Sequence, residues 1–174
     1  MGTFSKSEDA IFRKGTLVFI VTGTQAPFDR LLSIIDQWAG NQDKYTVIAQ
    51  TANSQTAFKN MTCYDYLEPD IFSDYFNRAD LIIGHAGIGT IIKALENKKK
   101  LVVFPRLEKY NEHRNDHQYH TAFGFEKLGL INVAYNECDL KKYLNKTLDI
   151  PVKRKISKNA EQKLLAKISN FINQ

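Results

Sequence analysis

The chain has 174 residues, of which 43% are hydrophobic and 25% are charged, which is typical of a single globular domain and excludes a disordered or fibrous protein. The net charge of +5 lies within residues 151–174, where six basic side chains face one glutamate, so residues 1–150 are neutral overall. A nucleic-acid-binding core would carry its own basic face, and a membrane helix would need about 20 apolar residues. The sequence indicates neither.

The first fifteen residues indicate a cytoplasmic protein, and the two cysteines indicate neither a disulfide framework nor a zinc site. Residues 1–15 are polar, have mixed charge and contain no apolar signal-peptide core, so they are predicted to form a flexible arm. Cys63 and Cys138 are too few for a disulfide framework or a four-cysteine zinc site. We expect both to be buried, reduced thiols.

Residues 16–150 are predicted to form one domain in which short apolar strands alternate with amphipathic helices. Strands are expected over residues 16–21, 45–50, 60–66, 81–83, 101–104 and 131–134. Helices are expected over residues 28–39, 69–78, 90–97, 116–127 and 139–145. This alternation is typical of βαβ units, so the predicted fold class is α/β, with a Rossmann-like parallel sheet and helices on both faces.

The end of the chain, residues 151–174, is predicted to be a basic amphipathic helix. Lysines fill most of its polar positions, and its apolar stripe consists of Ala160, Leu164, Leu165, Ile168, Phe171 and Ile172. Such a helix could pack back on the domain with a solvated basic face. It could also contact a partner subunit or an anionic membrane surface.

Three loops of unusual composition follow predicted strands, at residues 22–27, 84–90 and 105–118. Parallel strands end at the same edge of a sheet, and ligands of such folds bind outside the carboxyl ends of the strands. The three loops are therefore predicted to form one ligand site.

Loop 84–90 is rich in glycine and connects a strand to a helix. Its glycines would let the backbone approach a ligand, and the N–H groups that open the helix suit a phosphate or diphosphate. Thr90 could cap the helix or donate to a phosphate oxygen, and His85 could donate to the same group. The Gly-x-x-Gly-x-Gly spacing is neither the dinucleotide-binding order nor a P-loop, and tight packing of strand against helix is an alternative explanation.

Loop 105–118 is densely polar. Its histidines His113 and His117 are spaced i,i+4, which could bind zinc if this stretch were helical. The sequence has no His-Glu-x-x-His pattern, however, and no metal site is predicted. The alternative is a helix that starts at Asn115 and Asp116, with Gln118 and a histidine facing a polar ligand.

Together the three loops resemble a known family. VTGTQAPFDRL (residues 21–31), ADLIIGHAGIGT (residues 79–90), and PR followed by EHRNDHQ (residues 105–118) match motifs of the C-terminal, donor-binding half of GT-B glycosyltransferases of family 28. The similarity is greatest to stand-alone versions of that half, above all to the PssE-type proteins of bacterial exopolysaccharide and capsule synthesis. It extends over residues 16–145.

The resemblance implies a site for a UDP-sugar donor. Gly23 and Thr24 would lie near the donor diphosphate, and Asn115 and Gln118 would contact sugar hydroxyls. Backbone N–H groups and the helix dipole would hold the diphosphate and the near side of the sugar at His85, Ala86, Gly87, Ile88, Gly89 and Thr90.

The resemblance leaves the ribose contact and the catalytic base open. Where the wider family has a ribose-binding glutamate this sequence has Lys93, and Glu96 one turn later is a candidate for that role. Inverting transfer also needs a base for the acceptor hydroxyl, which full-length relatives take from their other domain. Glu112 or His113 could serve here, or a partner could supply the base.

The function implied by the resemblance is that of one subunit of a two-subunit, metal-independent, inverting hexosyltransferase without a cofactor. The donor would be UDP-galactose, UDP-glucuronate or UDP-N-acetylglucosamine, and the acceptor a saccharide on a polyprenyl diphosphate. A membrane-anchored subunit resembling the acceptor domain would complete the cleft and hold this cytoplasmic chain at the inner face of the plasma membrane. The alternatives are a non-catalytic enhancer subunit that binds no donor, and a nucleotide-sugar epimerase.

Overall fold

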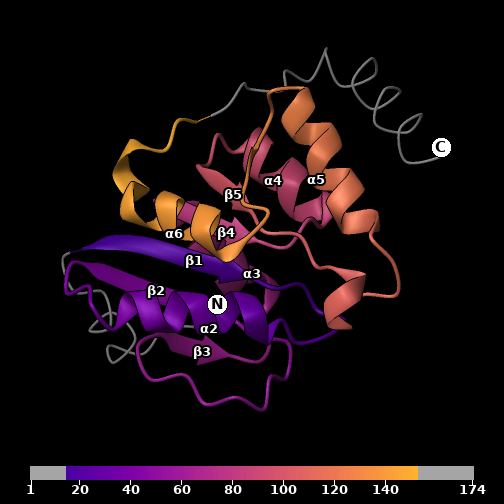
Figure 1. Cartoon of the computed structure of the whole chain (residues 1–174). Helices are drawn as coiled ribbons and strands as arrows, with labels where there is room; N and C mark the ends of the chain where they lie inside the picture. Colours follow the sequence, from indigo (N-terminus) through magenta and orange to yellow (C-terminus); the bar gives the residue numbers. More distant parts are fainter. Residues whose placement is uncertain (1–14, 153–174) are drawn as a thin grey trace.

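A computed structural model of the protein describes residues 15–152 (Figure 1). The predicted flexible arm lies outside this range except for its last residue, and the predicted C-terminal amphipathic helix lies outside it except for its first two. None of the helices within residues 15–152 has the length and apolarity that crossing a membrane requires.

The described residues form a six-stranded parallel sheet with the order β3-β2-β1-β4-β5-β6. Its strands are β1 (Thr16–Val21), β2 (Tyr45–Gln50), β3 (Thr62–Tyr64), β4 (Leu81–Gly84), β5 (Leu101–Val103) and β6 (Asn132–Val133). The helices are α2 (Asp29–Ala39), α3 (Pro69–Arg78), α4 (Ile88–Glu96), α5 (His117–Lys127) and α6 (Glu137–Asn145), with 3-10 turns η1 (Glu108–Tyr110) and η2 (Thr147–Asp149). Every strand and helix predicted within residues 16–150 is present, with small shifts at some ends.

Helices cover both faces of the sheet, which confirms the predicted fold class (Figure 1). In β1, the side chains of Phe19 and Val21 pack in the same core cluster as residues of α3, α4 and α5. Val18 and Ile20 point to the other face and pack with α2 and α6. Because both faces of the strand are covered, β1 reads in the sequence as a continuous apolar run.

The order of the strands reverses between β1 and β4. The chain runs outward from β1 to β2 and β3 on one side, and from β4 to β5 and β6 on the other. Val21 pairs with Gly84 at the carboxyl ends of the two strands, so loops 22–27 and 84–90 start side by side. This is the position at which α/β sheets of this kind bind their ligands.

Helix α4 begins earlier than predicted. Its N-cap is Gly87, which has an extended conformation (φ −76°, ψ 125°), and the Ile91 N–H donates to the Gly87 carbonyl oxygen over 3.1 Å. The helix therefore starts inside the glycine-rich loop. Thr90 lies within its first turn and does not cap it, so that prediction is wrong.

Both cysteines are exposed, so the prediction of two buried thiols is wrong. Cys63 lies on β3, the edge strand of the sheet, and Cys138 lies in the first turn of α6. Side chains on edge strands and on outer helix faces can point into solvent. The prediction rested on the tendency of cysteine to be buried, which does not show where a cysteine lies in the fold.

We expect Cys63 to react slowly with thiol reagents despite its exposure. Partial burial of its sulfur, together with the carboxylates of Asp36 and Asp65, raises the pKa of the Cys63 thiol to about 11, and only the thiolate is reactive. Alkylation with iodoacetamide at about pH 8, followed by peptide mass spectrometry, should modify Cys138 at least about 10-fold faster than Cys63. Equal rates would contradict the expectation.

Candidate functional site

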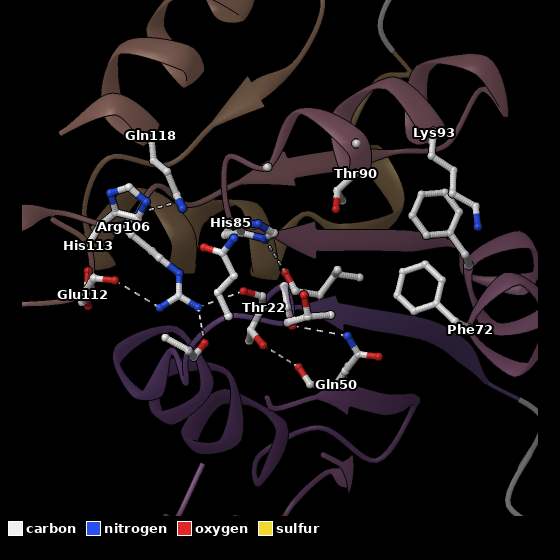
Figure 2. Close-up of a pocket in the computed structure, with 18 residues that line it drawn as sticks. Thr22, Gln50, Phe72, His85, Thr90, Lys93, Arg106, Glu112, His113 and Gln118 are labelled. Carbon is white, nitrogen blue, oxygen red and sulfur yellow. Dashed lines mark hydrogen bonds between the residues drawn. The ribbon is translucent and has the colours of Figure 1, made fainter. Parts of the chain in front are cut away.

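A cavity of about 450 Å³ opens where β1 and β4 end (Figure 2). Its walls come from all three predicted loops together with residues of β2, α3 and α4. The structure thus brings together most of the predicted site residues, namely Gly23, Thr24, His85, Gly87, Gly89, Thr90, Glu112, His113 and Gln118.

Three predicted site residues are not among those that line the cavity. Ala86 is buried, with only 4% of its surface exposed. Ile88 is the first residue of α4 and is exposed. Asn115 contacts the imidazole of His113 and so lies behind a cavity residue.

The imidazole of His85 is wedged between the two glycine-containing loops. The main-chain N–H of His85 lies 3.1 Å from the Val21 carbonyl oxygen, and Nδ1 of the ring lies 3.3 Å from the same oxygen. A Cβ atom on Gly23 would lie 3.0 Å from Nε2 of the ring, and one on Gly87 would overlap Nε2 and lie 2.7 Å from Cε1. Glycine at both positions therefore leaves room for the ring, and Gly23 also has a φ of 89° that other residues rarely adopt.

His85 presents a hydrogen-bond acceptor to the cavity. The Val21 carbonyl oxygen can only accept, so Nδ1 carries the ring proton. Burial, with a smaller contribution from the positive charge of Arg106, lowers the pKa of His85 to about 4. The ring is therefore neutral near neutral pH, and Nε2 accepts, whereas the sequence led us to expect a donor to phosphate.

We expect His85 to make the domain less stable in acid. Its pKa is about 4 in the folded chain against an ordinary value of 6.5, so the unfolded chain takes up this proton first as the pH falls. The stability that depends on a neutral His85 is fully present above about pH 6.5 and is lost progressively towards about pH 4. The total loss in the free energy of unfolding is about 3 kcal/mol.

The measurement is urea unfolding of the wild type and of His85→Asn across this pH range. The asparagine amide can still donate to Val21 but does not titrate, so the variant should lose less stability in acid than the wild type. Parallel pH profiles of the two proteins would contradict the assignment.

Gln118 ties loop 84–90 to loop 105–118. Its Oε1 accepts hydrogen bonds from the main-chain N–H groups of Ala86 and Arg106, each over 3.2 Å. The amide nitrogen takes no part in these two bonds, and the side chain lines the cavity. Gln118 therefore has donors left for a polar ligand.

His113 is held in one tautomer by Asn115. Nδ1 of the ring lies 3.1 Å from both the carbonyl oxygen and Oδ1 of Asn115. Oδ1 also accepts from the His117 N–H over 3.2 Å, so both partners of the ring are acceptors. The proton of a neutral His113 therefore sits on Nδ1, and Nε2 keeps its lone pair.

Glu112 lines the cavity but its carboxylate is engaged by other groups. Oε1 pairs with Arg30 Nε over 2.6 Å, and Oε2 pairs with Arg30 Nη2 over 2.7 Å. Oε2 also accepts from the Leu107 N–H over 3.0 Å. The side chain braces loop 105–118 against α2, which favours His113 over Glu112 as a base.

The zinc arrangement considered from the sequence does not form. His113 lies in the loop and α5 begins only at His117, so the two rings are not one turn apart on a helix. Within residues 15–152 no group of three or more metal-ligating side chains is placed to hold a metal ion.

Arg106 is a cavity residue that sequence reasoning did not select. It is only 4% exposed and donates to main-chain carbonyl oxygens of loop 22–27. Its place directly after a buried strand and a proline, within the PR pair of the third motif, is the signal in the sequence that could have selected it.

The other side of the cavity is apolar and carries Lys93. Figure 2 shows Phe72 and Lys93 on this side, away from Arg106 and His113. The Lys93 ammonium lies 4.9 Å from the centroid of the Phe72 ring and 3.1 Å from Ser73 Oγ. Lys93 lines the cavity, whereas Glu96 is exposed and is not among the lining residues, so the geometry gives Glu96 no support as a ribose contact.

The fold is similar to that of several solved structures. The NMR structure of ALG13 is 19% identical, with a TM-score of 0.59 over 87% of this chain and 96% of that one. MurG from Acinetobacter baumannii is 17% identical (TM-score 0.59, 94% of this chain, 52% of that one). A UDP-GlcNAc 2-epimerase from Neisseria meningitidis, solved with UDP-GlcNAc, is 10% identical (TM-score 0.54, 95% of this chain, 47% of that one). The chain thus spans nearly all of ALG13 but about half of the other two, and the likeness shows a shared fold.

The sequence itself decides the family. No curated protein matches it in a direct comparison, but residues 17–174 match the profile of the glycosyltransferase family 28 C-terminal domain. The chain belongs to this family. The family 28 resemblance drawn from the three loops is therefore confirmed, as is the GT-B C-terminal type of fold.

The cavity of this family 28 domain is suited to an anionic ligand. The N–H groups of the first turn of α4 have no partner within the helix, and the positive end of the helix dipole lies at Gly87 and Gly89 in the cavity wall. Lys93 and Arg106 add two positive charges, against the single negative charge of Glu112. A phosphate or diphosphate fits both features.

Proposed function

We propose that this family 28 domain is the donor-binding subunit of a two-subunit, inverting glycosyltransferase. It would move a hexose from UDP-galactose, UDP-glucuronate or UDP-N-acetylglucosamine to a saccharide carried on a polyprenyl diphosphate. Family membership supports glycosyl transfer. The likeness of the three loops to PssE-type proteins supports a place in exopolysaccharide or capsule synthesis.

One observation carries the proposal: the amino-terminal turn of α4 opens into the cavity at the sheet edge where β1 and β4 end. Transfer from a UDP-sugar develops negative charge on the leaving diphosphate. Fixed N–H groups and a helix dipole aimed at that charge stabilise it in the transition state, where a metal would act in other transferases. Gly87 and Gly89 leave the backbone open to the diphosphate.

His113 is the proposed base for the acceptor hydroxyl. Its Nε2 keeps a lone pair because Asn115 holds the Nδ1 proton, and the ring lines the same cavity as the proposed diphosphate site. Such a base must lie within hydrogen-bonding reach of the hydroxyl that attacks the sugar. A base supplied by the partner subunit is the alternative.

The acceptor side of the cleft would come from a membrane-anchored partner. Ile88 and Tyr110 are exposed, with 39% and 51% of their surface accessible, on segments that adjoin the cavity wall. Large apolar side chains so placed are suited to burial against another subunit. The chain would then lie at the inner face of the plasma membrane through that partner.

The first test is binding of UDP, UDP-sugars and uridine to the isotope-labelled protein, followed by NMR. UDP should bind more tightly than uridine, and the largest amide shifts should fall at residues 22–25, 84–90 and 113–118. Absence of UDP binding at about millimolar concentration would contradict donor binding and favour the enhancer subunit. Transfer from a UDP-sugar panel to a lipid-linked acceptor, with the partner co-expressed, then identifies the donor.

A nucleotide-sugar epimerase is a second candidate. The similarity of the fold to that of a UDP-GlcNAc 2-epimerase from Neisseria meningitidis favours it. Interconversion of a UDP-sugar without any acceptor, followed by NMR of the sugar protons, would support this activity and count against transfer.

A further inference from the structure

Arg106 is the only charged residue within residues 15–152 that is buried. Its terminal nitrogens donate four hydrogen bonds, all to main-chain carbonyl oxygens. Nη2 donates to Thr22 over 2.8 Å and to Ala26 over 2.6 Å. Nη1 donates to Pro27 over 2.6 Å and to Glu112 over 3.4 Å. The guanidinium therefore fixes loop 22–27 against loop 105–118.

Arg106 forms no ion pair within the part of the chain that the structure describes, and the carboxylates of Glu112 and Asp29 act on its charge only from a distance. The ion pairs found there do not include it, and the Glu112 carboxylate is taken by Arg30. Neutral carbonyl groups and the Phe28 ring, 4.5 Å from the guanidinium carbon, surround the cation instead. Buried charges in proteins are normally paired, because an unpaired one loses its hydration without compensation.

One N–H donor of the guanidinium, at Nε, is left without a hydrogen-bond partner among residues 15–152. Nε is also not fully buried, because the fully buried polar side-chain atoms without a partner in that range do not include it. Since Arg106 lines the cavity, this N–H is open to a ligand in the cavity. The field of the same charge reaches the neighbouring His85, whose pKa it lowers.

We propose that Arg106 recognises the diphosphate of the donor. Three of its N–H groups hold loop 22–27 and a fourth donates to Glu112 in loop 105–118, while the Nε–H and the positive charge, which has no ion-pair partner among residues 15–152, are kept for an anionic oxygen of the ligand. This inference rests on the proposed donor site for the identity of the ligand. It adds a residue that contacts the diphosphate and explains why an arginine is buried at this point.

The test compares UDP with uridine in the wild type and in variants, by isothermal titration. Arg106→Gln should weaken UDP binding about 10- to 100-fold, the loss expected for a charged hydrogen bond, and change uridine binding less than about 2-fold. Arg106→Lys keeps the charge but not the fork of donors, so it should retain most of the preference for UDP. The matched control is Arg114→Gln, which removes an exposed charge from the same loop and should leave both affinities unchanged.

A second measurement uses the wild-type protein and therefore does not depend on whether a variant folds. The side-chain Nε–H resonance of Arg106 in the labelled wild type should shift when UDP or pyrophosphate is added and stay in place with uridine. Equal loss of UDP and uridine binding in folded Arg106→Gln, or no shift of this resonance with saturating UDP, would overturn the proposal. A wild type that binds no UDP at all would instead refute the proposed donor function.

Discussion

Replacing Gly87 by alanine is expected to abolish most UDP binding while the domain stays folded. The added Cβ would overlap His85 Nε2 and lie 2.7 Å from Cε1, and the ring cannot easily turn away because Nδ1 is bonded to the Val21 carbonyl oxygen. The backbone of Gly87 (φ −76°) suits alanine, so the fold itself is not strained. Displacement of the ring into the cavity, or of the α4 terminus away from it, should weaken UDP binding at least about 100-fold, or about 2.7 kcal/mol.

Two further variants separate the clash from other causes. Gly89→Ala adds the same methyl group two residues later, where no protein atom lies within 4 Å, so stability should rise by about 0.5–1 kcal/mol through better helix propensity. Because Gly89 also lines the cavity, this variant is a control for stability and not for UDP affinity. His85→Ala combined with Gly87→Ala removes the ring that collides, so the two changes should not be additive in UDP binding. Wild-type affinity in Gly87→Ala alone would show that the position of the His85 ring does not matter.

Replacing His113 by glutamine is expected to lower glycosyl transfer about 10²- to 10⁴-fold, the usual effect of losing a general base. The affinity for UDP should hardly change, because the proposed role of Nε2 concerns the acceptor hydroxyl. The assay adds the purified chain to membranes of a source strain that lacks it, and follows the sugar from UDP-sugar into lipid-linked product.

Glu112→Gln tests the other candidate base under the same conditions. Because the Glu112 carboxylate pairs with Arg30, its loss should lower the free energy of unfolding and loosen loop 105–118. The rate should fall less than in His113→Gln. A greater loss of rate in Glu112→Gln, with stability unchanged, would assign the base to Glu112. Normal rates in both variants would assign it to the partner.

Local residue patterns were enough to predict the strands and helices and the edge of the sheet at which the site lies. The apolar runs of β1 and β2 and the proline that opens α3 fix those elements locally, so their predicted bounds agree with the structure. Loops after parallel strands must lie at one edge of the sheet, so the three loops could be predicted to meet before their contacts were known. Family 28 membership follows from the same loops, because their order and composition are carried by the sequence.

Which side chains face the cavity, and what they do there, depends on contacts between residues that are far apart in the sequence. Arg30 and Glu112 are 82 positions apart, and Arg106 lies 84 positions from the Thr22 carbonyl to which it donates. The acceptor character of His85 depends on the Val21 carbonyl, 64 residues earlier in the chain. Burial, ion pairing and tautomer are set by neighbours that the strand order brings together, and local sequence patterns carry no record of such neighbours. The exposed cysteines have the same explanation, since the position of Cys63 at the sheet edge and of Cys138 on an exposed part of α6 are properties of the whole fold.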